Sequence, residues 1–321
     1  MMNRLTLERR QVWIYLAAIL AGLLLGGRFP GLAPLFESLL WPVLGVLLYT
    51  TFVQVPLLHV REAFRDRRFL AANLAGNFLL IPLLLWLTLP WLPEDPALHL
   101  GVLLVLLVPC TDWFITFTQL GRGDTARAIA VSPLNLLLQL MLLPLYLWLM
   151  LPATELGALQ TEALLPAALA LIGLPLAAAA ASERWIEAKP QRAAWRERLA
   201  WWPVPLLAIV VLLIAGAQIN AVRDVGPLLL TVLPLFAGFL LVAALLARLL
   251  TSLLQLPAAS GRTLAYGFGT RNSFVVLPFA LALPPGWETT VVVIVFQSLV
   301  ELFGMVFYLW WLPRHPFRYP E

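Results

Sequence analysis

Residues 99–120 read HLGVLLVLLVPCTDWFITFTQL, an apolar run that a polar cluster interrupts near its centre. The run is long enough for a membrane helix, which needs about 20 predominantly apolar residues. Pro109 has no amide hydrogen and clashes with the preceding turn, so we expect the helix to kink or unwind there. Cys110, Thr111 and Asp112 follow directly. The stretch therefore predicts a broken membrane helix that carries functional side chains.

A second apolar run, residues 263–283, is interrupted in the same way by the sequence GTRNS at residues 269–273. Gly267 and Gly269 give the backbone freedom to leave the helical conformation here. Irregular backbone is tolerated inside a membrane only where protein or a water-filled cavity surrounds it. We therefore expect the two broken helices to meet around one cavity.

The composition of the whole chain excludes a soluble globular protein. Of its 321 residues, 61% are hydrophobic and 12% are charged, whereas soluble domains carry about 25% charged residues. The apolar runs are too long, and alternate too little, for the roughly 10-residue strands of a membrane β-barrel. An all-α membrane protein remains, with ten predicted transmembrane helices. Their predicted ranges are 11–27, 37–58, 69–92, 99–120, 125–151, 162–182, 201–219, 228–253, 263–283 and 289–312.

The basic residues indicate how these helices are oriented. Most of the 21 Lys and Arg residues fall in the tails or in loops on one side, which the positive-inside rule makes cytoplasmic. We therefore predict a multi-pass protein of the cell inner (plasma) membrane with both termini in the cytoplasm. The net charge of +4 follows from this topology, so we expect the lipid bilayer, and no nucleic acid, as a partner.

The basic connection 183–200 divides the chain into two halves of five predicted helices each. Because five is odd, the second half would be inverted relative to the first. The sequences YLWL at 146–149 and YLWW at 308–311 close the two halves. Inverted repeats with interrupted helices in matching positions are typical of secondary transporters. We predict repeats over 1–157 and 158–321; the alternative is chance similarity between segments rich in Leu, Trp and Pro.

Three ionisable residues, Asp112, Arg271 and Glu301, lie well inside predicted spans, away from the span ends, where a charge is costly and by default functional. One hypothesis is a buried Asp112–Arg271 ion pair that makes both charges tolerable. The other makes Asp112 a proton-binding group that Arg271 tunes. Glu301 has no basic partner assigned from the sequence. It is either a proton carrier or a protonated residue that packs by bonding to Gln297 or Ser298.

Cys110 is the single cysteine, so it cannot form a disulfide within the chain. It is either a small buried hydrophobe or a soft thiolate ligand for a metal or metalloid. Asn135 and Gln139 are four residues apart and therefore share one helix face. Common hydrolase and metalloprotease signatures are missing, so we expect no enzyme activity and no cofactor; a membrane-embedded enzyme is the remote alternative.

The sequence resembles the arsenite efflux permeases, the arsenical-resistance family of the bile acid/arsenite/riboflavin transporter superfamily. The resemblance rests on Cys110, the turn LGRGD at 120–124, Asn135, and Glu301 after Leu-Val. It implies a bile acid:sodium symporter-like fold of two inverted five-helix repeats, with broken helices 4 and 9 crossing at the midplane. The implied core domain comes from about 69–152 and 228–312, and the implied panel domain from about 11–58 and 162–219.

The sequence departs from that superfamily at several positions. Gly267 stands where the sodium/bile-acid branch has a sodium-binding Glu, and Arg271 where it has a sodium-binding Gln. Phe114 and Ile115 replace its Ser-Asn pair, and the Glu that arsenite permeases carry near Val275 is absent. Because hard cations need oxygen ligands, we expect that this chain has lost the sodium sites and holds no other metal.

We therefore predict a secondary active transporter that exports a small solute, arsenite or another trivalent metalloid, in exchange for protons. The alternative is a proton- or sodium-coupled organic-anion carrier in which Arg271 binds a carboxylate. The predicted substrate-binding residues are Cys110, Thr111, Asn135, Asn272 and Ser273, and the predicted charge pair and proton-coupling residues are Asp112, Arg271 and Glu301.

Overall fold

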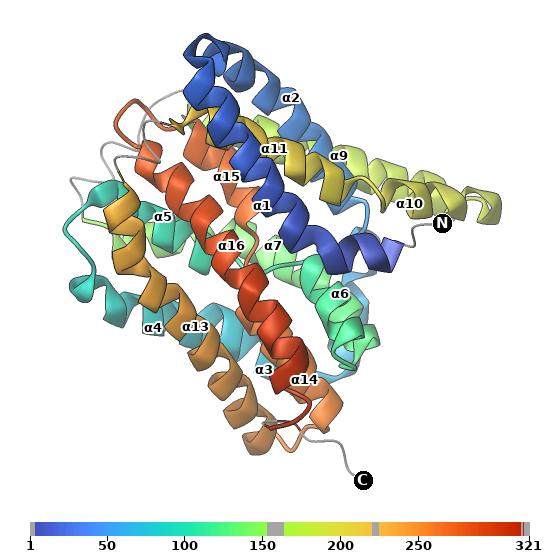
Figure 1. Ribbon diagram of the computed structural model, residues 1–321. Coiled ribbons are helices and arrows are strands. Elements are labelled where there is room, and N and C mark those ends of the chain that lie inside the picture. Colours follow the sequence, from blue (N-terminus) through green and yellow to red (C-terminus); the bar gives the residue numbers. More distant parts are fainter. Residues whose placement is uncertain (1–3, 153–163, 220–224, 316, 318–321) are drawn as a thin grey trace.

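A computed structural model describes residues 4–152, 164–219, 225–315 and 317, which form helices joined by short connections (Figure 1). The β-pairing among these residues is one isolated bridge. The helices are α1 (Arg4–Arg28), α2 (Ala33–Phe52), α3 (Arg67–Ala75), α4 (Ile81–Thr88), α5 (Pro96–Leu106), α6 (Trp113–Leu120), α7 (Thr125–Met150), α9 (Leu164–Glu187), α10 (Ala193–Leu199), α11 (Pro203–Ala217), α13 (Gly226–Leu253), α14 (Ala258–Gly269), α15 (Ser273–Leu281) and α16 (Glu288–Trp311).

Seven helical ranges in the described part of the chain are long and apolar enough to cross a membrane. Large apolar side chains on these ranges, such as Leu24, Trp86 and Leu245, are exposed, and extensive exposed apolar surface marks contact with a membrane or a partner. The chain is therefore a multi-pass membrane protein. The seven ranges are Arg10–Arg28, Pro30–Phe52, Arg67–Trp91, Thr125–Met150, Pro190–Ala217, Gly226–Leu253 and Glu288–Trp311.

Helices occupy all ten ranges predicted from the sequence. The ranges 99–120 and 263–283 are each divided between two helices, as their polar clusters predict. The range 37–58 is too long, because α2 ends at Phe52 and Pro56 precedes a separate 3₁₀ segment, Leu57–Arg65. The number of membrane crossings and the inverted repeats stay predictions.

The helices pack in two groups. In the first, α1 packs along α11, and α2 contacts both α11 and α9 (Figure 1). A Cβ atom built on Gly22 or Gly26 of α1 would lie 2.3 Å from the carbonyl oxygen of Leu212 or Gly216 of α11, respectively. Small residues at this spacing let membrane helices approach closely. In the second group, α16 contacts α5, α13 and α15. The groups contain helices of the predicted panel and core domains, and the division into domains stays a prediction.

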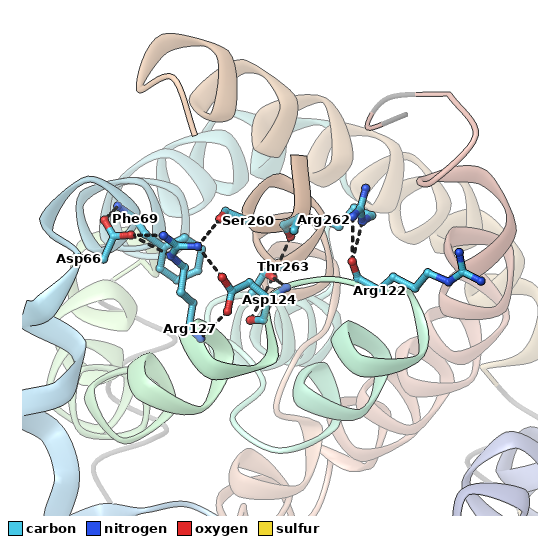
Figure 2. A network of polar contacts seen from close by, with 9 residues as sticks. Asp66, Phe69, Arg122, Asp124, Arg127, Ser260, Arg262 and Thr263 are labelled. Carbon is cyan, nitrogen blue, oxygen red and sulfur yellow. Dashed lines mark hydrogen bonds and ion pairs between the residues drawn. The ribbon is translucent and has the colours of Figure 1, made fainter. Parts of the chain in front are cut away.

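At one end of the molecule, Arg127 joins three helices that are distant in the sequence (Figure 2). Its guanidinium donates to the carboxylates of Asp66 (Nε to Oδ2, 2.8 Å) and Asp124, and to the Ser260 hydroxyl at 2.9 Å. Asp66 also caps α3 by accepting the amide hydrogen of Phe69 at 3.0 Å. These bonds fix the first turns of α3, α7 and α14 against one another.

The turn between α6 and α7 lies against α14. A Cβ atom on Gly121 would lie 2.0 Å from the hydroxyl oxygen of Tyr266, so the close approach of this turn requires glycine. The Arg262 guanidinium donates to the carbonyl of Arg122 at 2.8 Å and 3.0 Å (Figure 2). The LGRGD sequence therefore positions α6, the second half of the broken helix, relative to α14.

Asp66 predicts a dependence of stability on acidity. The hydrogen bond from the Phe69 amide, aided by Arg127, lowers the pKa of the Asp66 carboxyl against the opposing effect of burial. A carboxyl with a lowered pKa stabilises the fold above its unfolded-state pKa, and this stability is lost as pH falls through the folded-state value. Asp66→Asn, which keeps a capping oxygen, should cost about 0.5–1 kcal/mol at pH 7 and reduce the acid-induced loss, as measured by thermal unfolding at several pH values.

Asp95 is a matched control, because it caps α5 through the Leu98 amide at 3.0 Å and has no ion pair among the described residues. Asp95→Asn should change stability less than Asp66→Asn at neutral pH. Equal losses for the two variants would show that the Arg127 network contributes nothing beyond helix capping.

Candidate functional site

The two interrupted helices meet backbone to backbone. Helix α5 ends at Leu106 and α6 begins at Trp113, while α14 ends at Gly269 and α15 begins at Ser273. Between them, the amide of Cys110 donates to the Thr270 carbonyl at 3.1 Å, and the amide of Asn272 donates to the Val108 carbonyl at 2.8 Å. Each unwound segment thus satisfies polar backbone groups of the other, as a non-helical segment inside a membrane requires. We call residues 107–112 and 270–272 the crossing.

Glu301 of α16 is buried against the crossing. Its Oε2 accepts the amide hydrogen of Arg271 and a hydrogen from Nε2 of Gln297, both at 2.9 Å. The hydroxyl of Ser273 in turn donates to Oε1 of Gln297 at 3.2 Å. The sequence assigned no basic partner to Glu301. In the structure, its carboxylate accepts from the backbone amide of Arg271 and from Gln297, which is one of the two neighbours expected from the sequence.

The Arg271 side chain is 2% exposed and points back along α14. Its guanidinium donates to Oδ1 of Asn77 at 3.0 Å and to carbonyls of the last turns of two half-helices. These are the carbonyls of Leu106 (3.3 Å), Gly267 (3.4 Å) and Phe268. The face of the guanidinium lies 5.2 Å from the centre of the Phe239 ring.

The predicted Asp112–Arg271 ion pair is not among the contacts that the Arg271 guanidinium makes with the described residues. Among the described residues, the guanidinium bonds to neutral oxygens, and the acid in contact with Arg271 is Glu301. The physical reason is the unwinding after Gly269, which leaves carbonyls at the end of α14 without helical partners. A cation is favoured at such a helix C-terminus.

A chain of three buried asparagines connects α7 with Arg271. Nδ2 of Asn77 donates to Oδ1 of Asn73 at 3.2 Å, and Nδ2 of Asn73 donates to Oδ1 of Asn135 at 2.7 Å. Asn77 lies in a short π-helical turn, Gly76–Leu80, between α3 and α4. One turn after Asn135, the buried side-chain amide of Gln139 has no hydrogen-bond partner among the described residues.

Asp112 lines a cavity, and the buried Cys110 lies beside Asp112. The Cys110 thiol, which is 3% exposed, donates to Oδ1 of Asp112 at 3.2 Å. Asp112 and Trp113 line a cavity of about 530 Å³ that extends between α1, α6, α7 and the α10–α11 segment. A solute in this cavity therefore reaches the carboxylate that holds the thiol. Beside them, Oγ1 of Thr111 accepts a hydrogen from the side-chain Nδ2 of Asn272 at 3.2 Å.

A second cavity of about 300 Å³ lies at the other end of the helix pair α2 and α11. It is lined by Trp41 near the start of α2 and Ala217 at the end of α11. The first cavity is lined instead by Gln54, just after α2, and by Val204 at the start of α11. The molecule thus has a cavity at each end of α2 and α11, and the first contains Asp112.

Outside the crossing, the fold brings three potential metal ligands together. Donor atoms of His59, Glu183 and Glu187 lie within 4.8 Å of one another, a proximity that the sequence spacing did not indicate. Nη2 of Arg196 lies 3.9 Å from a carboxylate oxygen of each Glu, so a positive charge already occupies their neighbourhood. Arg196 also lines the cavity that contains Asp112.

Most of the residues predicted to form the site lie together. The crossing and its immediate contacts include seven of them, and Asn135 is connected to Arg271 through Asn73 and Asn77. Their roles in binding or coupling stay predictions. Sequence reasoning left Asn77, Asn73 and Gln297 out of the predicted site, although each is a polar residue within a predicted span. The seven predicted site residues at the crossing or in contact with it are Cys110, Thr111, Asp112, Arg271, Asn272, Ser273 and Glu301.

Comparison with protein families identifies a match over more than half of the chain. The model of the Sodium Bile acid symporter family matches residues 41–224. The match includes the first interrupted helix, with Cys110 and Asp112, and the helix that carries Asn135. A comparison with curated proteins found no matching relative.

Proposed function

Because the chain belongs to the sodium bile acid symporter family, we propose that it is a secondary active transporter that exports a small solute in exchange for protons. The observation that carries this proposal is the cavity of about 530 Å³ that Asp112 lines, beside two interrupted helices. Broken helices at one site are the arrangement from which secondary transporters build their binding sites.

Transport requires that the site open alternately to the two sides of the membrane. The two cavities at opposite ends of α2 and α11 support such a movement. We propose that a panel domain, residues 11–58 and 162–219, rocks against a core domain, residues 69–152 and 228–312. The crossing would belong to the core and travel with the solute.

The cavity that contains Asp112 is proposed to face the cytoplasm. Basic residues gather at this end, at the start of α3, in the α6–α7 turn and in α10, and positive charge is concentrated in the cytoplasmic loops of membrane proteins. With both termini cytoplasmic, the structure would represent the inward-facing state of an inner-membrane exporter. The residues at this end include Arg67, Arg68, Arg122, Arg127, Arg196 and Arg198.

We propose a trivalent metalloid such as arsenite as the solute, because a thiol is a soft ligand suited to a soft centre. Arsenous acid would form an As–S bond with Cys110 as one As–OH bond and the S–H bond break. The released hydroxyl and the thiol proton leave as water. Asp112, which accepts the thiol hydrogen at 3.2 Å, would transfer that proton, and water would reverse the reaction on the outer side.

Protons would be carried by the two carboxylates at the site. Asp112 faces the cavity, and Glu301 is buried on the other side of the crossing, 2% exposed. Ionisable residues at such positions are typical of proton relays in transporters. Protonation of Glu301 would change its bond to the Arg271 amide and thereby connect the proton to the geometry of the crossing.

An organic anion is the second candidate solute. The position of Arg271 does not favour this candidate, because its guanidinium donates hydrogen bonds to buried oxygens and does not line the cavity. Arg196 supports it, because this residue lines the cavity and its Nε and Nη2 have no hydrogen-bond partner among the described residues. A guanidinium is well suited to bind a carboxylate, and a solute carboxylate would compete for it with Glu183 and Glu187, whose oxygens lie 3.9 Å from Nη2.

Solute counterflow in proteoliposomes tests these proposals. Vesicles preloaded with unlabelled arsenite should accumulate labelled arsenite, and this exchange should survive Arg196→Gln. Exchange of an organic anion that is lost in Arg196→Gln but kept in Cys110→Ser would establish the second candidate instead. No exchange of either class of solute would contradict the proposed solutes.

A further inference from the structure

The guanidinium of Arg271 occupies a cage of oxygens. Oδ1 of Asn77 and the carbonyls of Leu106, Gly267 and Phe268 all accept its hydrogens. These oxygens come from three separate segments of the chain: the π-helical turn, the end of α5 and the end of α14. A set of neutral oxygens that converge on one positive charge is the chemistry of a binding site for a hard monovalent cation.

Two features make this cage favourable for a cation. The carbonyls belong to the C-terminal turns of two half-helices, whose dipoles place partial negative charge there. In transporters, such half-helix ends and unwound carbonyls coordinate sodium. The Glu301 carboxylate, 2.9 Å from the Arg271 amide, supplies a full negative charge next to the cage.

We propose that Arg271 is a tethered cation that fills this site permanently, and that removing its charge opens a sodium site. A sodium ion does not fit the residues as they stand, because the four oxygens already bond to a guanidinium whose charge would repel the ion. The family's description as sodium symporters therefore does not extend to this cage. The inference concerns the cation at the crossing and holds whichever solute is carried.

The experiment compares thermal unfolding in sodium chloride and in choline chloride at equal ionic strength. Wild-type protein should unfold at the same temperature in both salts. Arg271→Gln should be less stable than wild type in choline chloride. Sodium at about 100 times its dissociation constant should raise its midpoint by about 5 °C, because a ligand that binds only the folded state stabilises it.

Three further variants make the test specific. Arg271→Lys keeps a tethered cation and should not respond to sodium. Arg262→Gln removes another buried arginine, one that donates to the carbonyls of Arg122 and Phe317, and should lose stability equally in both salts. Adding Asn77→Ala to Arg271→Gln removes one cage oxygen and should raise the sodium concentration needed for the same shift of the midpoint.

Several results would overturn the proposal. One is a wild-type midpoint that rises with sodium, which would mean that the cage is not filled. Another is an Arg271→Gln protein that unfolds at the same temperature in both salts. Failure of Arg271→Gln to fold even in saturating sodium would also count against it, because sodium is expected to take the place of the guanidinium.

Discussion

Replacing Cys110 by serine is expected to abolish arsenite export while leaving the yield and the unfolding temperature of the protein nearly unchanged. Cys110 is the single thiol of the chain, and its hydrogen bond to Asp112 places it next to a residue that lines the cavity. Serine is close in size and can make the same hydrogen bond, but its hard oxygen is a poor ligand for trivalent arsenic. Arsenite resistance of a sensitive host that expresses the variant provides the measurement.

Ser298→Ala is the matched control for this prediction. Ser298 is buried on α16 and donates to the carbonyl of Ile294 at 2.9 Å, within its own helix and outside the crossing. This variant should confer the same resistance as wild type. If Cys110→Ser also leaves resistance intact, the thiol does not bind the solute.

Replacing Glu301 by glutamine is expected to abolish export driven by a pH gradient while counterflow of the solute continues. Glutamine is nearly isosteric, and its oxygen can still accept the amide hydrogen of Arg271, but it cannot carry a proton. The substitution removes the negative charge next to the buried Arg271, whose amide bonds to Glu301, so the unfolding temperature should fall. The oxygens that hold the Arg271 guanidinium should nevertheless preserve the crossing.

The measurement compares gradient-driven uptake with counterflow in the same proteoliposomes. Glu288→Gln changes an acid in the first turn of the same helix, which contacts the Gly286 amide outside the crossing, and should leave both activities unchanged. A Glu301→Gln protein that still responds fully to the pH gradient would exclude Glu301 as a coupling residue.

The helices could be predicted because their signals are local. A range of apolar residues bounded by Pro, Gly and charges places a helix within a few residues, as for 125–151 and α7, Thr125–Met150. Both interruptions were also found, because Pro109 and the glycines around Gly269 act on the backbone of their own segment. The end of α2 was missed, since an apolar run continues past Phe52 into a different kind of helix.

The partners at the site could not be predicted, because they depend on how the segments turn in three dimensions. The direction of the Arg271 side chain follows from the unwound backbone of residues 270–272, which no periodicity describes. Asn77 is one of several polar residues in its predicted span, and only the π-helical turn at Gly76–Leu80 places it against the guanidinium. The sequence therefore indicated which residues lie together at the crossing, but not which hydrogen bonds they form with one another.

The most direct test of the account is arsenite transport by wild-type protein in proteoliposomes free of sodium, with a pH gradient imposed across the membrane. We expect transport that follows the pH gradient, stops when a protonophore removes the gradient, and is unchanged when sodium replaces choline. Transport that requires a sodium gradient and ignores the protonophore would contradict the proposed proton exchange.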